Sequence, residues 1–333
     1  MPPSRRELHH MAIRQRVREH AEPHHGIFRR ADLDDLRVDH TVIRTFLKRG
    51  WWTRLHHGIY IDTDVLTEAT EPMQRVRILS SAAIATLSGP AFSFGPGSGG
   101  LHGLAVDRRL LTAISVVRPR DTDQRALHRR VTTTSELGDI TVHRHAIDLD
   151  ATTEIDGIPV VDRRTAAIST AARSDPMWAV ATLDSLLWVD PMTPDELDSC
   201  VEVWSGLRGI GLVRQAASLA RHGAQTPLET FSRLQFITDG IPEPVLQFPV
   251  YDEQGLVGYA DMAWPDLKII GEADGLLKYQ AREDVIAEKT REDRMRAQGW
   301  IVVRWTWAEI MNTPHVVIAR IRRAMAEAVR RSA

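Results

Sequence analysis

The 333-residue chain has 42 Lys/Arg against 44 Asp/Glu, and its 43% hydrophobic and 26% charged residues are typical of a globular protein with two or three domains. The single cysteine, Cys200, excludes a disulfide framework and a cysteine zinc site, and no apolar run is long enough for a membrane span. Because the start also lacks a signal-peptide core, the sequence indicates a cytoplasmic protein with no membrane partner.

Charge is distributed unevenly along the chain. Residues 1–60 hold 12 Lys/Arg and 7 Asp/Glu, a net charge of +5, whereas residues 61–224 have a net charge of −5 and residues 225–333 of −2. A basic excess is expected where a protein contacts phosphates. The N-terminal segment is therefore the expected site of nucleic-acid binding.

The first sixty residues predict three helices followed by two short strands. Asp39 is suited to cap the third helix and Gly50 to end it. In the first helix, Met11 is expected to face inward and Arg14 outward. The expected helices span residues 9–20, 30–36 and 40–49, and the strands lie within residues 51–60 and turn near His57-Gly58.

Three helices and a strand pair, over residues 1–65, are the elements of a winged helix-turn-helix, in which the third helix enters the major groove of DNA. The outward side chains of that helix and the polar side chains of the strand pair would then contact DNA. Alternatively, the module packs against another part of the chain or a partner protein. The predicted DNA-binding residues are Thr41, Arg44, Thr45, Lys48, Arg54, His56 and His57.

This passage resembles the N-terminal domain of AbiEi-type antitoxins in Gly50-Trp51, Arg54 and Gly58-Ile59-Tyr60. Residues 72–205 are similar to the second, α/β domain of that family. The resemblance implies a DNA-binding regulator. Strands are expected at 111–117, 140–146 and 157–161, with helices at 74–87, 163–173, 177–188 and 194–203.

The segment from residue 88 to residue 103 is rich in Gly and Pro and is expected to be a loop. It contains Gly95-x-Gly97-x-x-Gly100, which formally matches the dinucleotide-binding fingerprint. Pro96 interrupts the motif, and neither a preceding strand nor a following helix is expected. A dinucleotide site is therefore rejected.

After a helical connector at 206–224, residues 225–333 carry carboxylates within apolar strands. Apolar runs at 257–264 and 267–272, hinged at Pro265-Asp266, predict a hairpin. With a two-residue loop, Asp261 faces Ile270 and Glu272 lies diagonally from Asp261, about 7–8 Å away on the same face. Asp274 returns to that face two residues later. The alternative is a hydrated surface with ordinary acids.

The C-terminal region also resembles the PD-(D/E)xK nuclease fold, in the branch similar to very-short-patch-repair endonucleases. The shared pattern is a helical Glu, a strand Asp, Glu-x-Asp-Gly, a charged helix and Gly-Trp-x-Val-x-Arg. The matching residues are Glu229, Asp261, Glu272, Asp274-Gly275, Asp293-Arg294, Gly299-Trp300 and Arg304. The resemblance implies a central mixed sheet, so that the whole chain is an α/β multidomain protein.

The nuclease resemblance implies magnesium- or manganese-dependent hydrolysis of DNA phosphodiesters. Asp261 and Glu272 would hold the metal, with Glu229 and Asp274 as helpers. Lys278 replaces the histidine usual in the related branch, and Asp274 replaces the lysine of the Glu-x-Lys pattern. Arg304 would contact DNA or pair with an acid of the site. The alternative is a non-enzymatic DNA-binding regulator with an inactive nuclease fold. Assembly with a second copy or with a partner protein also stays open.

Overall fold

The computed structural model describes residues 4–119, 129–132, 139–274 and 282–332 of the chain. The described residues form a mixed α/β protein with three sheets. They divide into two compact units, Met1–Ser174 with Cys200–Gly211, and Asp175–Ser199 with Leu212–Ala333. Within the described ranges, no helix combines the length and apolar character needed to cross a membrane.

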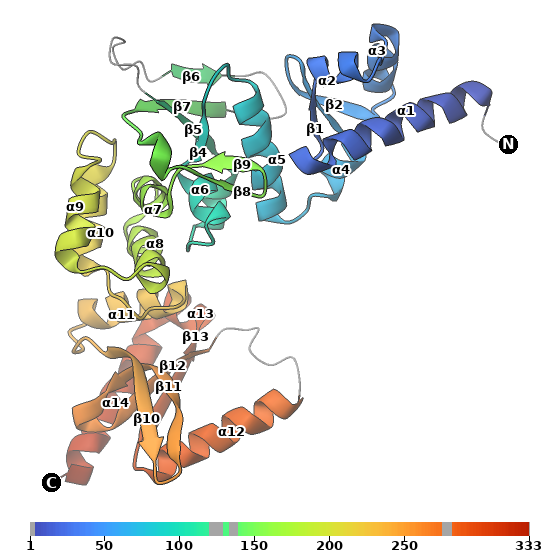
Figure 1. The fold of residues 1–333 in the computed structure, drawn as a ribbon. Helices are drawn as coiled ribbons and strands as arrows, with labels where there is room; N and C mark the ends of the chain where they lie inside the picture. Colours follow the sequence, from blue (N-terminus) through green and yellow to red (C-terminus); the bar gives the residue numbers. More distant parts are fainter. Residues whose placement is uncertain (1–3, 120–128, 133–138, 275–281, 333) are drawn as a thin grey trace. The chain divides into compact units, whose positions relative to one another are not determined.

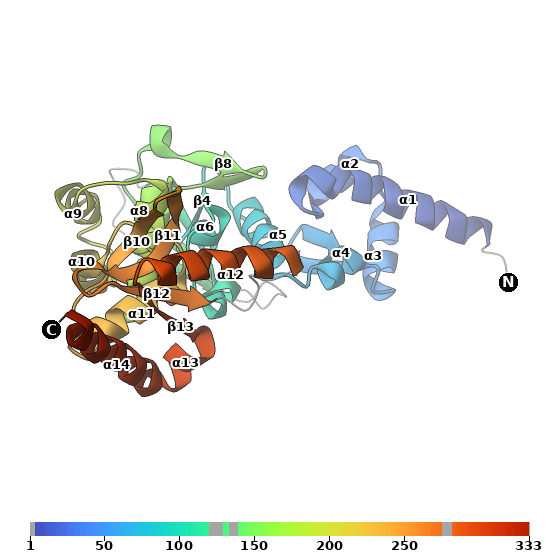
Figure 2. The same ribbon diagram turned by 90° about the horizontal axis from the view of Figure 1, so that it is seen from below.

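The N-terminal module of the first unit contains the three helices and the strand pair predicted from the sequence. Asp39 caps the third helix, α3, because its Oδ1 accepts a hydrogen bond of 2.6 Å from the Thr41 backbone N–H. A further short strand, β1, pairs with β3 to give the antiparallel order β1-β3-β2. Figures 1 and 2 show the helices around this sheet. The elements are α1 (Arg5–Ala21), β1 (Ile27–Arg29), α2 (Arg30–Asp35), α3 (His40–Lys48), β2 (Trp52–His56), β3 (Ile59–Asp62) and α4 (Thr63–Glu68).

Two expectations for α1 are wrong. Met11 is 56% exposed, and His10 takes a buried position on the helix in its place. Arg14 turns toward the protein, where its guanidinium donates two hydrogen bonds of 2.6 Å to Asp62 and one of 2.7 Å to Asp64. Asp62 is buried, and a buried carboxylate requires a cationic or hydrogen-bonding partner. Arg14 therefore fastens α1 to the end of β3.

A six-stranded sheet with the order β6-β7-β5-β4-β9-β8 forms the second part of the first unit. The expected strands correspond to β5, β7 and β9, and the expected helices to α5 and α7. The bounds are α5 (Pro72–Ala85), β4 (Phe92–Phe94), α6 (Pro96–Leu101), β5 (Ile114–Pro119), β6 (Arg129–Thr132), β7 (Asp139–His145), β8 (Thr153–Ile155), β9 (Ile158–Val160) and α7 (Arg163–Ala171).

The expected loop at 88–103 is wrong, because this segment contains the strand β4 and the short helix α6. Close packing explains its glycines. A Cβ added to Gly99 would lie 2.5 Å from Oγ1 of Thr170 in α7, and one added to Gly100 would lie 2.8 Å from the Met73 sulfur in α5. Only residues without a side chain let this helix approach its neighbours so closely.

The second unit contains a four-stranded mixed sheet, as the sequence analysis expected for the C-terminal region. Its order is β10-β11-β12-β13, with β12 and β13 parallel and the other pairs antiparallel. The strand β10 was not anticipated. The elements of this part are α8 (Pro176–Val189), α11 (Pro227–Thr238), β10 (Val245–Asp252), β11 (Gly255–Trp264), β12 (Ile269–Asp274), α12 (Arg282–Ala297), β13 (Ile301–Thr306), α13 (Trp307–Asn312) and α14 (Pro314–Ser332), and the unit boundaries fall near α9 (Pro194–Glu202) and α10 (Ile210–Leu219).

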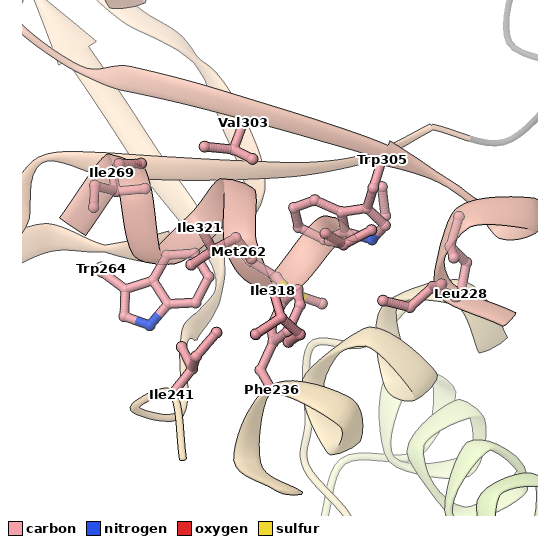
Figure 3. Close-up of a cluster of buried hydrophobic side chains, with 14 of the residues drawn as sticks. Leu228, Phe236, Ile241, Met262, Trp264, Ile269, Val303, Trp305, Ile318 and Ile321 are labelled. Atoms are coloured by element: carbon pink, nitrogen blue, oxygen red, sulfur yellow. The ribbon is translucent and has the colours of Figure 1, made fainter. Parts of the chain in front are cut away.

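The two faces of this sheet are covered by different helices. On one face, Phe236 of α11 and Ile321 of α14 pack with Trp305 of β13, as Figure 3 shows. On the other face, Met295 of α12 packs on Ile270 of β12. Because side chains alternate along a strand, the polar positions of β12 lie on the α12 face.

The predicted hairpin register is wrong by two residues. Trp264 pairs with Ile269 and Met262 with Gly271, so continuing the register places Asp261 opposite Glu272 instead of diagonally from it. The connection is a 3₁₀ turn over Pro265–Leu267 followed by Lys268 with a φ of 50°, which is longer than a two-residue loop. A shift of two residues keeps both carboxylates on one face.

Candidate functional sites

The first candidate site is the outer surface of α3 and the β2–β3 hairpin. Arg44, Lys48, Arg54 and His57 are exposed there, while His56 is half-buried. Arg44, Lys48 and Arg54 make this surface cationic.

The two threonines of this surface serve the helix itself. The hydroxyl of Thr41 donates to the cap residue Asp39, and that of Thr45 donates to the Thr41 carbonyl at 2.7 Å. Their methyl groups and lone pairs are what remains for a ligand. Of the side chains named above, the three cations Arg44, Lys48 and Arg54 and the two histidines therefore offer the most charge and hydrogen-bonding chemistry to a ligand.

An aromatic core holds α3 in place. Phe46 is fully buried, and its ring centroid lies 4.7 Å from Trp52, 5.0 Å from Trp51 and 5.3 Å from His10. The sequence analysis missed Arg49, whose guanidinium lies 5.1 Å from the centre of the Trp51 ring and extends the cationic surface past the end of α3. The available signal was an arginine directly before Gly50-Trp51.

The second candidate site is a row of polar residues across the four-stranded sheet. Glu272 of β12 pairs in register with Arg304 of β13. Continuing the register of the other strand pairs places Asp261 of β11 opposite Glu272, and Gln247 of β10 opposite Asp261. This Gln-Asp-Glu-Arg row crosses all four strands of the sheet.

Asp261 is positioned by the backbone of the next strand. Its Oδ2 accepts a hydrogen bond of 2.8 Å from the Ala273 N–H. The last paired residues of the two strands are Met262 and Gly271. Beyond them, the Asp261 side chain accepts the hydrogen bond that a backbone carbonyl would accept in a regular sheet. This contact holds the Asp261 carboxylate between β11 and β12, beside Glu272.

Glu272 is only 2% exposed and pairs with an arginine of α12. Nη2 of Arg291 lies 3.2 Å from Oε1 of Glu272, and Nη1 donates to the Tyr259 carbonyl at 3.1 Å. A buried carboxylate gains from such a charge-assisted contact. Arg291 was not among the predicted site residues, because nothing in the sequence distinguishes it from the other arginines of this helix.

Asp274 and Arg304 form a neighbouring ion-pair network. Nη1 of Arg304 lies 3.1 Å from Oδ1 of Asp274, and its Nη2 lies 3.0 Å from Oε2 of Glu292. Burial opposes ionisation of Glu292, but the hydrogen bond from Arg296 and the charge of Arg304 hold the pKa of Glu292 below its ordinary value. Of the two roles expected for Arg304, the structure shows pairing with an acid of the site.

Glu229 lies at the start of α11, 3% exposed. Oε1 accepts from the Thr226 hydroxyl at 2.8 Å and Oε2 from the Gln225 N–H at 2.9 Å, while the Thr226 hydroxyl caps the helix by accepting from the Glu229 N–H. Nε2 of Gln247 also lies 3.4 Å from Oε2. Gln247 has a φ of 46°, a backbone conformation uncommon for a non-glycine residue in a strand. The sequence analysis missed Gln247, since it did not predict β10.

The carboxylate pair fits the chemistry of magnesium. Asp261 and Glu272 supply hard oxygen donors, and magnesium is usually held by one or two carboxylates together with water and phosphate oxygens. Within the described residues, no group of three or more His, Cys, Asp or Glu side chains is arranged to hold a metal ion. Lys278 lies outside the described residues. When bound there, magnesium would supply Lewis acidity toward a phosphate oxygen.

Comparison with known proteins bears on the N-terminal module. Residues 15–61 match a family model described as a transcriptional regulator, AbiEi antitoxin, and this stretch runs from within α1 to within β3. The N-terminal module is therefore similar to that regulator domain, which agrees with the resemblance noted from the sequence and supports the expectation of DNA binding.

Relatives in Mycobacterium tuberculosis include an uncharacterized protein of strain CDC 1551 and another of strain ATCC 25618. The chain is 30% identical to each over 145 residues, which cover 44% of this chain and 54% of the relative. The matched region thus spans about half the length of these curated relatives. Their descriptions assign no activity.

Proposed function

We propose that the protein binds DNA through α3 and the β2–β3 hairpin of a winged-helix N-terminal module, as a regulator of the antitoxin type does. The observation that carries this proposal is the exposure of Arg44, Lys48 and Arg54 on a helix and hairpin held rigid by an aromatic core. Exposed cations on a fixed frame neutralise backbone phosphates and release counterions. The similarity of residues 15–61 to a transcriptional regulator supports it.

The test is binding of the full chain to a labelled duplex of about 30 base pairs, measured by fluorescence anisotropy. Wild-type protein should bind in the low-salt range and lose affinity steeply as salt rises. Unlabelled specific and random duplexes then compete for it, which separates sequence recognition from general affinity. Absence of duplex binding at low salt would end this proposal.

As a second candidate function, we propose that the second unit is a nuclease of the PD-(D/E)xK type that hydrolyses DNA phosphodiesters with magnesium or manganese. The observation that favours it is the register of β11 and β12, which puts Asp261 opposite Glu272 on one sheet face when it is continued past the Met262–Gly271 pair. Two oppositely placed carboxylates that repel each other are stabilised by a shared divalent cation. Asp261 and Glu272 would hold the ion, and Lys278 would steady the attacking water or the phosphate.

The remaining residues would act through these two. Glu229 fixes the start of α11 and reaches Gln247, which the register places beside Asp261. Arg304 neutralises Asp274 at the end of β12. On this reading Glu229 and Asp274 help by positioning the strands and balancing charge around the carboxylate pair.

Cleavage is tested by incubating the protein with supercoiled, linear, mismatched and single-stranded DNA, with and without magnesium or manganese. Asp261→Asn should abolish cleavage and the metal-dependent rise in melting temperature. A matched control is Asp266→Asn, in the 3₁₀ turn after β11, which should leave both unchanged. If wild type neither cuts any substrate nor responds to metal, the protein is a DNA-binding regulator with an inactive nuclease fold.

A further inference from the structure

Arg291 lies at the proposed metal site although it belongs to no metal-binding pattern. It projects from α12 toward β11 and β12, and its guanidinium lies 3.2 Å from Oε1 of Glu272. The side chain of Glu272 is 3% exposed and that of Arg291 is 23% exposed. The carboxylate is therefore reached from the α12 side by an arginine that is itself partly open to solvent.

The backbone of β11 is shaped to admit this arginine. A Cβ added to Gly258 would lie 3.2 Å from Cδ of Arg291, so a side chain at this position would press on the arginine stem. The next residue, Tyr259, accepts a hydrogen bond of 3.1 Å from Nη1 of Arg291 through its carbonyl oxygen. One nitrogen thus anchors the guanidinium to the strand while the other faces Glu272.

A guanidinium and a divalent cation compete for the same carboxylate. The Glu272 oxygen that Arg291 contacts is a hard donor of the kind that magnesium takes, and the two positive charges repel each other at close range. Burial makes this competition strong, because charges interact more strongly away from water. Both cations cannot occupy the same position beside Glu272.

We infer that Arg291 is the internal counter-ion of the acidic pair: it neutralises Glu272 in the metal-free protein and gives up that carboxylate when a divalent ion binds. This inference rests on the proposed metal-dependent function. The Tyr259 carbonyl keeps the released guanidinium at the site, where it is available to a phosphate oxygen. Arg291 is accordingly a positioning residue that sets the metal affinity of the site.

The test is isothermal titration of the full chain with magnesium chloride and with manganese chloride at constant ionic strength, on wild type and Arg291→Gln. Removing the competing charge should tighten metal binding by about tenfold, the factor expected from the loss of one charge-assisted contact. The metal-free melting temperature of Arg291→Gln should fall, because the ion pair with Glu272 is lost, and saturating metal should restore it. Arg291→Lys, which keeps the charge, should bind metal much as wild type does.

Arg294→Gln is the matched control. Arg294 lies on the same helix as Arg291, and its replacement removes an ion pair of 2.7 Å with Asp252, at the far end of the β10–β11 hairpin. Metal affinity should be unchanged by this variant. A double variant, Glu272→Gln with Arg291→Gln, should recover the metal-free melting temperature and lose the metal response, because neither charge remains.

The outcomes separate this inference from the function on which it rests. One outcome is that the wild type binds metal, Asp261→Asn does not, and Arg291→Gln binds it with unchanged affinity. This result would support the metal site but overturn the role of Arg291. If Arg291→Gln binds metal and the wild type does not, Arg291 excludes the ion from Glu272 completely, which would support the inference. Absence of metal binding in every variant would overturn both.

Discussion

Replacing three cations of the N-terminal surface should change the salt dependence of DNA binding in a calculable way. Arg44→Gln, Lys48→Gln and Arg54→Gln remove three positive charges from exposed positions on α3 and β2. Each phosphate contact contributes about −0.9 to the slope of log affinity against log salt, so the triple variant should flatten the slope by about 2.7. Across a fourfold rise in salt, the loss of affinity should then be about 40-fold smaller than in wild type.

The assay is fluorescence anisotropy with a 30-base-pair duplex at four salt concentrations between about 50 and 200 mM, a range over which phosphate contacts dominate. The matched control replaces Arg75, Arg108 and Arg330 by Gln, which removes the same charge from exposed positions outside the N-terminal surface. Exposed substitutions of this kind change stability little. Equal slopes for the two triple variants would show that net charge, and not the α3 surface, governs binding, and would refute the reasoning.

Three other predictions concern the frame that holds the sites. Val303→Asp should lower the free energy of unfolding, measured by urea denaturation, by at least about 3 kcal/mol, because Val303 is in the main core of the second unit. Val302→Asp should lower it less, because Val302 is only half-buried. The Asp184 side chain is 1% exposed and lies 3.0 Å from Arg233. Arg233→Met should therefore lower the free energy of unfolding by about 3–5 kcal/mol, because it removes the cation from a buried ion pair. Adding Asp184→Asn should restore part of this loss in the same assay. Burial lowers the pKa of His10, so the N-terminal module should lose stability as the pH falls below 6.5, the ordinary value, toward the folded pKa. His10→Leu should flatten that dependence in thermal melts, and an unchanged pH profile would contradict the assignment.

Local signals in the sequence were sufficient for most helices and for the hairpins of both units. Asp39 caps the helix that it was expected to start, and Gly50, with a φ of 68°, follows α3 as expected. Such signals succeed because a cap or a glycine stop depends on a few neighbouring residues and little else. The mixed sheet followed from the resemblance of the C-terminal region and not from local pattern.

Expectations failed where an outcome depended on residues far apart in the chain. A short strand such as β4 or β10 is stabilised by its neighbours in the sheet, so its own sequence identifies it poorly. Arg14 was expected in solvent because it lies among polar residues of a helix, yet it forms an ion pair with the buried Asp62, which is distant in the chain. Glycines in α6 looked like a loop, although close packing against α7 requires them.

From the sequence alone, strand periodicity indicates that Asp261 and Glu272 share a face of the sheet, because an error of two residues in register leaves each side chain on the same face. The surroundings of the two carboxylates depend on contacts between elements that lie apart in the chain, so they follow only from the folded arrangement. The register that follows from the 3₁₀ turn after Trp264, continued past the Met262–Gly271 pair, places Asp261 opposite Glu272, and Arg291 of α12 lies 3.2 Å from the Glu272 carboxylate. Charge compensation between a strand and a helix nineteen positions later depends on how the two pack, and packing is not encoded in any local pattern.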